Sequence, residues 1–392
     1  MSQNYANQDE LKEQLKEYLL QIKKNKQQSI EKKYDPKMLQ QVVGLEPREG
    51  YLHGEYVKRL VIFMRGTGCS HVTETGGCTF CGFYNATNFG EKISNQDYIL
   101  QIRNVIESKE IVFSEYPIIC LYNDGSMLNE KEISFEAVIS IFEMLKDQDS
   151  VKKIVIESRI ADITEEKLSS LKQITHKEVE IAVGFESANE TIRDLCINKN
   201  FSKEHFEETH QLAVNIGISI VPLLIIKPPY LTELEAIHDY VESLLYLEQF
   251  HFQRIDMELP TIEKDTLVYE LWQQQMYRPL WFWSVIEILR LLEKASFKTR
   301  LYISPPNYSV PAEVKTSNCD NCDDQIYQAI EAFNHLGDVT IFDSIECACQ
   351  TIWEEQLESD IWEGDIPARI EKSLEKLLKK SKQNEKIGEN VS

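Results

Sequence analysis

The sequence lacks any long hydrophobic run. No apolar stretch in its 392 residues approaches the roughly 20 residues that a membrane-spanning helix needs. Residues 1–9 also lack a basic patch followed by an apolar stretch, so we expect no signal peptide. These absences predict a cytoplasmic protein with no membrane partner.

Positive charge is scarce as well. The formal net charge is −22 at pH 7, and because both ends of the chain are lightly basic, the acidic excess lies between them. Such a surface repels phosphate backbones at long range, and no local basic patch offsets it. The charge therefore disfavours tRNA or any other nucleic acid as a partner. An acidic surface that keeps the protein soluble accounts for the same balance.

Apolar strand patterns alternate with helical patterns along most of the chain. The predicted strands are 57–64, 118–122, 153–156, 180–185, 218–226 and 252–258, and the predicted helices are 98–109, 132–147, 165–173, 202–215 and 233–249. Strands separated by helices predict repeated βαβ units and a parallel sheet. This periodicity is compatible with a doubly wound sheet and with part of a TIM-like barrel.

The positions of the polar clusters favour the barrel. A cysteine-rich loop follows the first predicted strand, and polar residues follow the next four strands at 123–126, 157–159, 186–187 and 227–229. In a (β/α) barrel the chemistry sits in the loops after the strands, whereas a doubly wound sheet binds ligands mainly at one switch point. We therefore predict an α/β fold: a partial (β/α)6 TIM-like barrel of parallel strands, with an N-terminal helix and a Cys-rich C-terminal extension.

Further elements lie outside this alternation. An amphipathic helix is predicted over 8–30, with a linker after Tyr34-Asp35-Pro36. A long helix begins at Trp281, where Trp281 and Trp283 are expected in the core, and a short strand and a final helix are predicted at 300–303 and 367–382. The predicted segments are a helical segment and linker (1–44), the partial barrel (45–300), the Cys-rich extension (301–365) and a C-terminal helix and tail (366–392).

Three of the nine cysteines, Cys69, Cys78 and Cys81, crowd the loop after the first strand. Reduced cysteines in a cytoplasmic protein favour metal or catalytic roles over disulfides. Three thiolates can hold three irons of a [4Fe–4S] cluster and leave the fourth iron open to a small molecule. The alternative is a structural zinc site, but His71 lies too near Cys69 to resemble a standard finger.

Four more cysteines form two close pairs near the C-terminus, Cys319 with Cys322 and Cys347 with Cys349. Together they can supply four thiolates, enough for a zinc ion or a second iron–sulfur cluster, and the spacing does not choose between these. The remaining Cys120 and Cys196 lie in or beside apolar segments and are predicted to be buried packing residues.

The cysteine loop resembles that of radical S-adenosylmethionine (SAM) enzymes. Thr79-Phe80-Cys81 supplies the Cys-x-aromatic-Cys ending, whereas the eight residues between Cys69 and Cys78 depart from the common CxxxCxxC spacing, as in branches with an Elp3/MiaB-like core. The most specific resemblance is to the archaeosine-biosynthesis radical SAM lyase family and its relatives, over most of residues 45–350. It rests on Arg65-Gly-Thr-Gly-Cys-Ser with Gly77-Cys-Thr-Phe-Cys-Gly-Phe-Tyr-Asn, Gly184-Phe-Glu-Ser-Ala-Asn-Glu with Asn198-Lys-Asn-Phe, Lys227-Pro-Pro-Tyr-Leu-Thr-Glu, and Tyr277-Arg-Pro-Leu-Trp-Phe-Trp-Ser.

This resemblance implies both a mechanism and its cofactors. In the superfamily, SAM chelates the open iron of the [4Fe–4S] cluster, and one electron cleaves SAM to methionine and a 5′-deoxyadenosyl radical that abstracts a substrate hydrogen. A flavodoxin-type or ferredoxin-type donor would supply the electron. So reactive a radical needs a site closed to water, which the mouth of a barrel provides.

Position along the chain assigns further residues to SAM. Residues 123–126 occupy the place of the glycine-rich motif that meets the SAM amino group, although an ordinary βα turn is the alternative. Glu157 suits ribose hydroxyls or an ammonium, and Arg159 suits a carboxylate, with a surface ion pair as the alternative. The predicted SAM-binding residues are Phe80, Asn123, Gly125, Ser126, Glu157, Arg159, Glu186, Ser187 and Arg193.

Three residues are predicted to contact the substrate. Lys227 ends an apolar strand before two prolines that stiffen its loop, so it could meet a substrate carboxylate; a solvated lysine is the alternative. Tyr277 and Arg278 precede an aromatic helix start and are expected to line the pocket.

The resemblance implies carbon–nitrogen cleavage of a lysine-modified 7-deazaguanine in tRNA. The acidic charge argues against assigning that tRNA substrate to this chain. A peptide, a protein or a small metabolite is the alternative substrate for the same catalytic core. A non-catalytic zinc protein that binds a basic partner is the alternative from another functional class.

Overall fold

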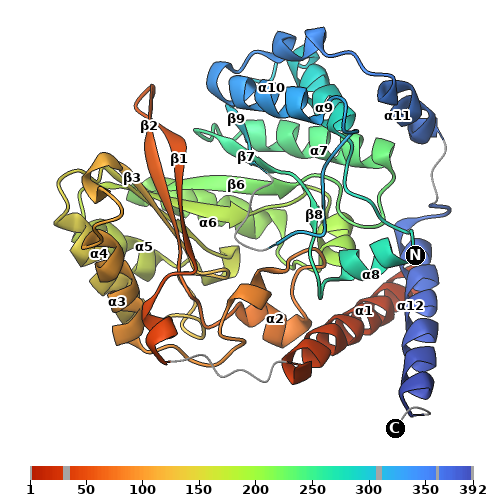
Figure 1. The fold of residues 1–392 in the computed structure, drawn as a ribbon, viewed down its shortest axis with the longest axis horizontal. Coiled ribbons are helices and arrows are strands. Elements are labelled where there is room, and N and C mark those ends of the chain that lie inside the picture. Colours follow the sequence, from red (N-terminus) through yellow and green to blue (C-terminus); the bar gives the residue numbers. More distant parts are fainter. Residues whose placement is uncertain (1, 30–35, 306–310, 359–361, 390–392) are drawn as a thin grey trace.

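The chain is described by a computed structural model that covers residues 2–29, 36–305, 311–358 and 362–389 (Figure 1). Its centre is a curled eight-stranded sheet in the order β1-β2-β3-β4-β5-β6-β7-β9, and β8 pairs with β10 in a separate small sheet. The strands are β1 (Gly44–Leu52), β2 (Glu55–Phe63), β3 (Ile118–Tyr122), β4 (Lys153–Glu157), β5 (Glu178–Gly184), β6 (Ser219–Ile225), β7 (Ile255–Glu258), β8 (Thr261–Ile262), β9 (Leu301–Ile303) and β10 (Val314–Lys315).

Helices connect the parallel strands and cover the outside of the curled sheet (Figure 1). All neighbouring strands from β2 to β9 pair in parallel, which confirms the predicted α/β partial barrel. The α-helices are α1 (Ser2–Ser29), α2 (Ser70–Thr75), α3 (Asn95–Ile106), α4 (Phe135–Lys146), α5 (Glu165–Ile174), α6 (Lys203–Ile216), α7 (Glu233–Glu248), α8 (Leu267–Gln273), α9 (Phe282–Lys294), α10 (Asp323–Leu336), α11 (Cys349–Glu358) and α12 (Ile366–Glu389). The short helical turns are η1 (Pro36–Gln40), η2 (Phe83–Ala86), η3 (Phe113–Glu115), η4 (Ile160–Asp162), the π-helical η5 (Ile192–Cys196) and η6 (Val339–Ser344).

Polar residues at the helix starts explain why the helices begin where they do. The side chains of Ser94, Ser134, Thr164 and Ser202 each accept a hydrogen bond from the backbone N–H three residues later. These caps satisfy N–H groups that a helix start otherwise leaves without partners. Thr232 adds a reciprocal capping box at the start of α7.

The strands bury different kinds of side chain on their two faces. In β2, Leu60 and Ile62 belong to the main apolar core, whereas Val61 and Phe63 belong to a separate cluster with residues of the neighbouring strands. This alternation is the two-residue period of a strand. The inside of the curled sheet also holds charge, which the apolar strand patterns did not predict: Arg254 Nη1 lies 2.8 Å from Glu180 Oε1.

Strand β1 was not predicted from the sequence. It pairs antiparallel with β2 alone and therefore forms one edge of the sheet. Most of its residues are partly exposed, so it carries no apolar alternation, and it contains Pro47, a residue that sheets tolerate mainly at edges. The predicted linker follows Tyr34-Asp35-Pro36, of which residues 34 and 35 lie outside the described residues, and it contains the helical turn η1; the boundaries of the four predicted segments stay predictions.

The N-terminal helix lies against the loop that carries Cys69, Cys78 and Cys81, and the helices at the two ends lie against each other. Helix α1 contacts α2 and α12 (Figure 1), so the predicted N-terminal and C-terminal helices are confirmed with longer bounds. Trp281 and Trp283 are buried at the start of α9, as expected. No helix in the described part of the chain is long and apolar enough to cross a membrane.

Candidate active site

The three loop cysteines lie at the carboxyl end of β2, around the short helix α2. Cys69 caps the start of α2, and Cys78 and Cys81 follow its end. Gly76 closes the helix with φ 87°, a conformation that favours glycine. A Cβ atom at Gly76 would lie 2.3 Å from Cβ of Leu19. Glycine here therefore allows helix α1 to pack directly on the cysteine loop.

Asn198 also fixes the cysteine loop in place. Its side-chain amide donates to the carbonyl oxygen of Gly77 at 2.8 Å, and the Thr79 hydroxyl donates to the carbonyl oxygen of Cys196 at 2.6 Å. His71 Nε2 lies 2.6 Å from the Asn198 carbonyl oxygen, and burial lowers the pKa of this histidine to about 4. The cysteine loop and the Asn198-Lys-Asn-Phe motif, which the sequence analysis named separately, therefore contact each other, and His71 contacts Asn198.

The donor set of the loop fits an iron–sulfur cluster. All three cysteines are free thiols. Burial raises the pKa of Cys69 to about 12 and that of Cys81 well above its usual value, so these thiols need a bound cation to stabilise their ionised form. Among groups of three or more His, Cys, Asp or Glu side chains in the described part of the chain, only the C-terminal four cysteines bring all their ligand atoms within 4.8 Å of one another. At least two of the three loop thiols therefore lie farther apart than this, which suits thiolates that bind different irons of a cluster.

Lys23 of α1 reaches the same loop and was not predicted. It is 6% exposed, and its ammonium donates to the carbonyl oxygen of Asp265 at 2.7 Å and to that of Cys81 at 3.4 Å. Burial lowers the pKa of Lys23, while the nearby thiols and carboxyls oppose that shift. A cation at this position favours ionised thiolates beside it.

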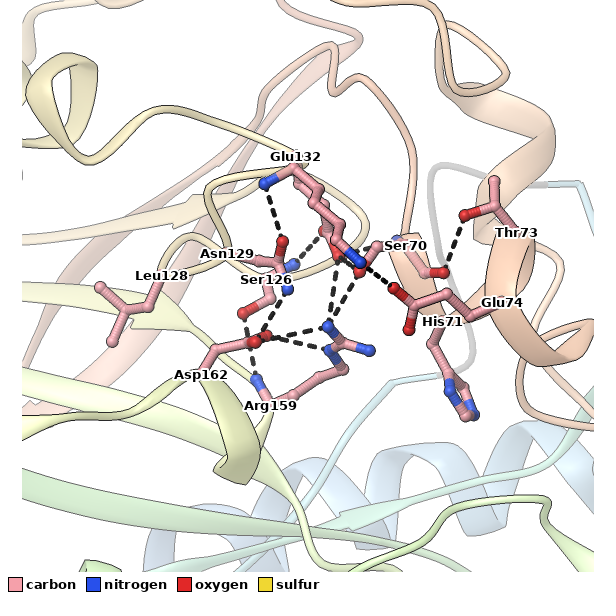
Figure 2. Close-up of polar contacts among 12 residues, drawn as sticks. Ser70, His71, Thr73, Glu74, Ser126, Leu128, Asn129, Glu132, Arg159 and Asp162 are labelled. Carbon is pink, nitrogen blue, oxygen red and sulfur yellow. Dashed lines mark hydrogen bonds and ion pairs between the residues drawn. The ribbon is translucent and has the colours of Figure 1, made fainter.

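Glu132 joins the cysteine loop to the loop after β3 (Figure 2). The carboxylate is 2% exposed; Oε1 accepts hydrogen bonds of 2.8 Å from the backbone N–H and the hydroxyl of Ser70, and Oε2 accepts one of 2.6 Å from the Ser126 N–H. Arg159 completes the network by donating to the Ser70 hydroxyl at 2.8 Å and to Asp162 at 2.9 Å. Glu132 is not identified from the sequence because the predicted helix 132–147 includes it, whereas α4 begins at Phe135.

The turn after β3 is held by Glu157. Its Oε1 accepts from the backbone N–H groups of Asn123 and Gly125 at 2.7 and 3.3 Å, and burial raises the pKa of Glu157 to about 7. Asp124, between them, has φ 58°, and its buried Oδ2 has no hydrogen-bond partner among the described residues. Burial raises the Asp124 pKa well above its usual value. An orphaned carboxylate oxygen of this kind suits an incoming ammonium.

A cavity of about 180 Å³, which we call the mouth cavity, lies between these groups inside the sheet. Of the predicted residues, Phe80, Cys81, Glu157 and Glu186 line it. Asp124 and Glu263 add further carboxyl groups to its wall. So many carboxyl groups in one small cavity favour a positively charged ligand group, such as the ammonium and sulfonium of SAM.

Glu186 is positioned by an ion pair with Lys199. The Lys199 ammonium lies 2.9 Å from Glu186 Oε1, and Glu186 Oε2 accepts from the Ile225 N–H at 3.0 Å. A Cβ atom at Gly184 would lie 2.0 Å from the Lys199 nitrogen, so glycine leaves the room that this pair occupies. Burial raises the pKa of the nearby Cys78 thiol, and the charge of Lys199 opposes that rise.

Comparisons with known proteins show what this chain is similar to. No family model matches the chain. The chain is 32% identical over 305 residues to an uncharacterised protein of Methanocaldococcus jannaschii, covering 77% of this chain and 82% of that protein. It is 29% identical over 309 residues to the archaeosine synthase subunit beta of Methanosarcina acetivorans, covering 78% and 87%. Elp3 of Methanocaldococcus infernus matches with TM-score 0.46 and 18% identity, over 61% of this chain and 59% of that structure.

The chain belongs to the radical SAM family. It is therefore an enzyme, and the non-catalytic zinc protein considered from the sequence is not supported.

Two predicted SAM residues of this radical SAM enzyme lie in a different buried cluster. Ser187 and Arg193 are fully buried; the Ser187 hydroxyl donates to Asp239 at 2.7 Å, and Arg193 donates to the backbone carbonyls of Ser187 and Phe201. The Arg193 guanidinium also stacks on the Phe201 ring at 4.3 Å. Neither side chain lines the mouth cavity.

Asp239 provides a pH test of this cluster. Burial raises its pKa to about 7 from 3.8, so the folded protein holds a proton there that the unfolded chain releases. Stability from this group is therefore complete at low pH and falls by up to about 4 kcal/mol as the pH rises from 4 to 7. Asp239→Asn should remove this part of the pH dependence in urea unfolding at pH 5 and 8. Glu143→Gln, at an exposed site, should leave it intact; an unchanged slope in Asp239→Asn would contradict the assignment.

The three predicted substrate residues gather around Glu233. Lys227 is 7% exposed and pairs with Glu233 Oε2 at 2.6 Å, so it is not the solvated lysine of the alternative. The Tyr277 hydroxyl donates to the Lys227 carbonyl oxygen at 2.9 Å, and Arg278 stacks on the Trp281 ring at 3.9 Å. None of the three lines the mouth cavity, and their contact with substrate stays a prediction.

The C-terminal cysteines converge on one point beside α9. The Sγ atoms of Cys319 and Cys322, Cys319 and Cys347, and Cys322 and Cys349 lie 3.6, 3.5 and 3.6 Å apart. The Trp283 indole N–H donates to the Cys349 sulfur at 3.2 Å. A backbone N–H lowers the pKa of Cys347 to about 7. The two pairs predicted from the sequence therefore form a single four-thiol site.

Proposed function

We propose that this radical SAM enzyme cleaves SAM at a [4Fe–4S] cluster held by Cys69, Cys78 and Cys81, and that it is a carbon–nitrogen lyase acting on a modified 7-deazaguanine in tRNA. The observation that carries the SAM chemistry is the position of Cys81 on the wall of a cavity lined with carboxyl groups. The lyase activity and the tRNA substrate are supported by the relatives named archaeosine synthase subunit beta and by the sequence motifs shared with that family.

The residues of this chain have distinct roles in that chemistry. When bound, the cluster supplies one electron to SAM, which yields methionine and a 5′-deoxyadenosyl radical. Asp124 and Glu157 offer carboxyl groups to the ammonium and the ribose of SAM on the cavity wall. Asn198, Glu132 and Lys23 hold the cysteine loop against the barrel. The inside of the curled sheet limits the access of water to the radical.

A partner subunit would reconcile the acidic charge with a tRNA substrate. The relatives are named as beta subunits, and a chain of net charge −22 is poorly suited to bind tRNA alone. A basic partner would be attracted to this surface and could present the RNA to the mouth cavity. A peptide, protein or small-metabolite substrate for the chain by itself is the alternative.

The four C-terminal thiols are proposed to bind a single zinc ion. With Zn–S bonds of about 2.3 Å, a tetrahedral site places its sulfur atoms about 3.8 Å apart. The measured separations of 3.5–3.6 Å are close to this value. An iron–sulfur cluster spreads its ligands over more than one iron and therefore needs wider spacing. The ion would tie α10 and α11 to α9.

An analysis of tRNA nucleosides and a tRNA-binding assay together test the proposed substrate. Cells that lack this chain should accumulate the unconverted 7-deazaguanine nucleoside in their tRNA, and expression of the wild-type chain should restore the product. Purified protein should shift bulk tRNA in a low-salt gel only after its partner is added. Identical tRNA nucleosides with and without the chain would contradict the tRNA proposal and favour a peptide or metabolite.

A further inference from the structure

Arg59 is a buried arginine on the inner face of the curled sheet. It lies in β2, opposite Arg48 of β1, and is 5% exposed. Gly50 leaves room for its side chain, because a Cβ atom at that position would lie 3.2 Å from Arg59 Cβ and 3.3 Å from Arg59 Cδ. The local sequence therefore accommodates a guanidinium inside the barrel.

Arg59 has no ion-pair or hydrogen-bond partner among the residues that the structure describes. Its Nε is buried without an acceptor, and its guanidinium carbon lies 5.4 Å from the centroid of the Tyr302 ring. Arg254, also inside the sheet, is by contrast paired with Glu180 and Asp256 at 2.8 Å each. Burying a charge without a partner is costly, so an anionic ligand is the natural counterpart for Arg59.

Arg59 lines two cavities that share a wall. One is the mouth cavity. The other, which we call the lateral cavity, has a volume of about 590 Å³ and lies between the β1–β2 hairpin and the β9–α10 region. Arg48, Arg59, Leu259 and Tyr302 line both cavities. A molecule entering through the lateral cavity therefore passes Arg59 before it reaches the carboxyl groups of the mouth cavity.

The lateral cavity also carries acidic groups. Glu49 and Glu331 lie on its wall, and Glu49 pairs with His335 at 2.7 Å. Asp256, on the wall of the mouth cavity, is engaged by Arg254. The carboxylates around Arg59 therefore leave its guanidinium available to a ligand.

We infer that Arg59 binds the anionic group of the substrate, a carboxylate or a phosphate, while the substrate's reacting end lies in the mouth cavity. Phe63, at the end of β2, is four steps along the strand from Arg59, a span of roughly 13 Å. A SAM molecule held at the cysteine loop keeps its own carboxylate at the loop, so the anion at Arg59 comes from another molecule. The planar guanidinium matches either anion with two parallel hydrogen bonds. As an assignment of the substrate, this inference rests on the proposed function.

Ligand titrations of full-length protein test the inference without turnover. The thermal midpoint would be followed with L-lysine, with cadaverine, which has the same chain without the carboxylate, and with inorganic phosphate. In the wild type, lysine or phosphate should raise the midpoint saturably, whereas cadaverine should not. Arg59→Gln should raise the half-saturating concentration by about tenfold or more. Arg103→Gln, at an exposed arginine in α3, should behave as the wild type.

The outcomes separate the two anion sources and the two proposals. A response to lysine alone identifies a carboxylate, and a response to phosphate alone identifies a phosphate. Equal responses in the wild type and Arg59→Gln, or no response in either, would overturn the inference. If Arg59→Gln does not fold, Arg59→Lys replaces it: a response equal to that of the wild type would also count against a guanidinium site. Failure of the wild type to release 5′-deoxyadenosine would instead count against the proposed function and leave the titration standing.

Discussion

Cys81→Ala is expected to abolish the visible iron–sulfur absorbance of anaerobically reconstituted protein and to lower its release of 5′-deoxyadenosine by more than about a hundredfold. Cys81 lies on the wall of the mouth cavity, and its carbonyl oxygen accepts from Lys23. One iron of the cluster has no protein ligand even in the wild type. With two thiolates left in the loop, a second iron also loses its protein ligand, and the cluster is no longer bound stably. Absorbance and product release would be measured on the same reconstituted sample.

Cys120→Ala is the matched control for this loss. Cys120 is fully buried in β3 and packs with apolar neighbours of the inner face, so its removal should cost some stability but leave the absorbance and the cleavage of SAM in place. Retention of colour and activity in a protein that lacks Cys69, Cys78 and Cys81 together would show that this loop does not hold the cluster.

Cys322→Ser is expected to release the C-terminal metal and to lower the thermal midpoint by about 5 °C. Structural zinc sites contribute binding free energy directly to folding, and the loss of about 3–5 kcal/mol corresponds to a shift of this size in a chain this long. Cys322 is 2% exposed at the start of α10. Without the ion, the four close thiols lose the bond network that ties α10 and α11 to α9. The zinc content measured by elemental analysis should fall from one ion per chain to none.

Trp283→Phe separates the effect of losing the metal from the effect of losing a hydrogen bond beside it. This change removes the N–H donor to Cys349 but keeps all four thiolates, so zinc should stay bound and the midpoint should drop far less. Iron in place of zinc, or a wild-type protein without metal that is as stable as the loaded form, would contradict the proposed zinc site.

The two cysteine groups illustrate what local sequence can predict. Cys69, Cys78 and Cys81 lie within one loop, and their spacing alone indicated three ligands of one site. Apolar alternation likewise placed the strands from β2 to β7, because each strand buries one face under helices. Edge strand β1 escaped prediction because most of its residues are partly exposed and do not need to be apolar.

The contacts that shape the mouth cavity could not be predicted in this way. Glu132 and Ser70 are 62 residues apart, Lys23 and Cys81 are 58 apart, and Asn198 and Gly77 are 121 apart. No local period links such partners, because they meet only when separate strand ends come together at one rim of the sheet. For the same reason, Ser187 and Lys227 follow strand ends yet bond to helix α7 through Asp239 and Glu233.

The sequence by itself indicated the candidate metal ligands, the alternation of strands and helices, and the family, because each depends on residue types at short, fixed spacings. Only the tertiary structure decided which carboxyl groups share a cavity with Cys81, and that four distant thiols lie close enough for one ion. It also decided that Arg59 is buried without a partner. The physical reason is that burial and pairing of charge depend on neighbours from several strands, which the order of residues along the chain does not specify.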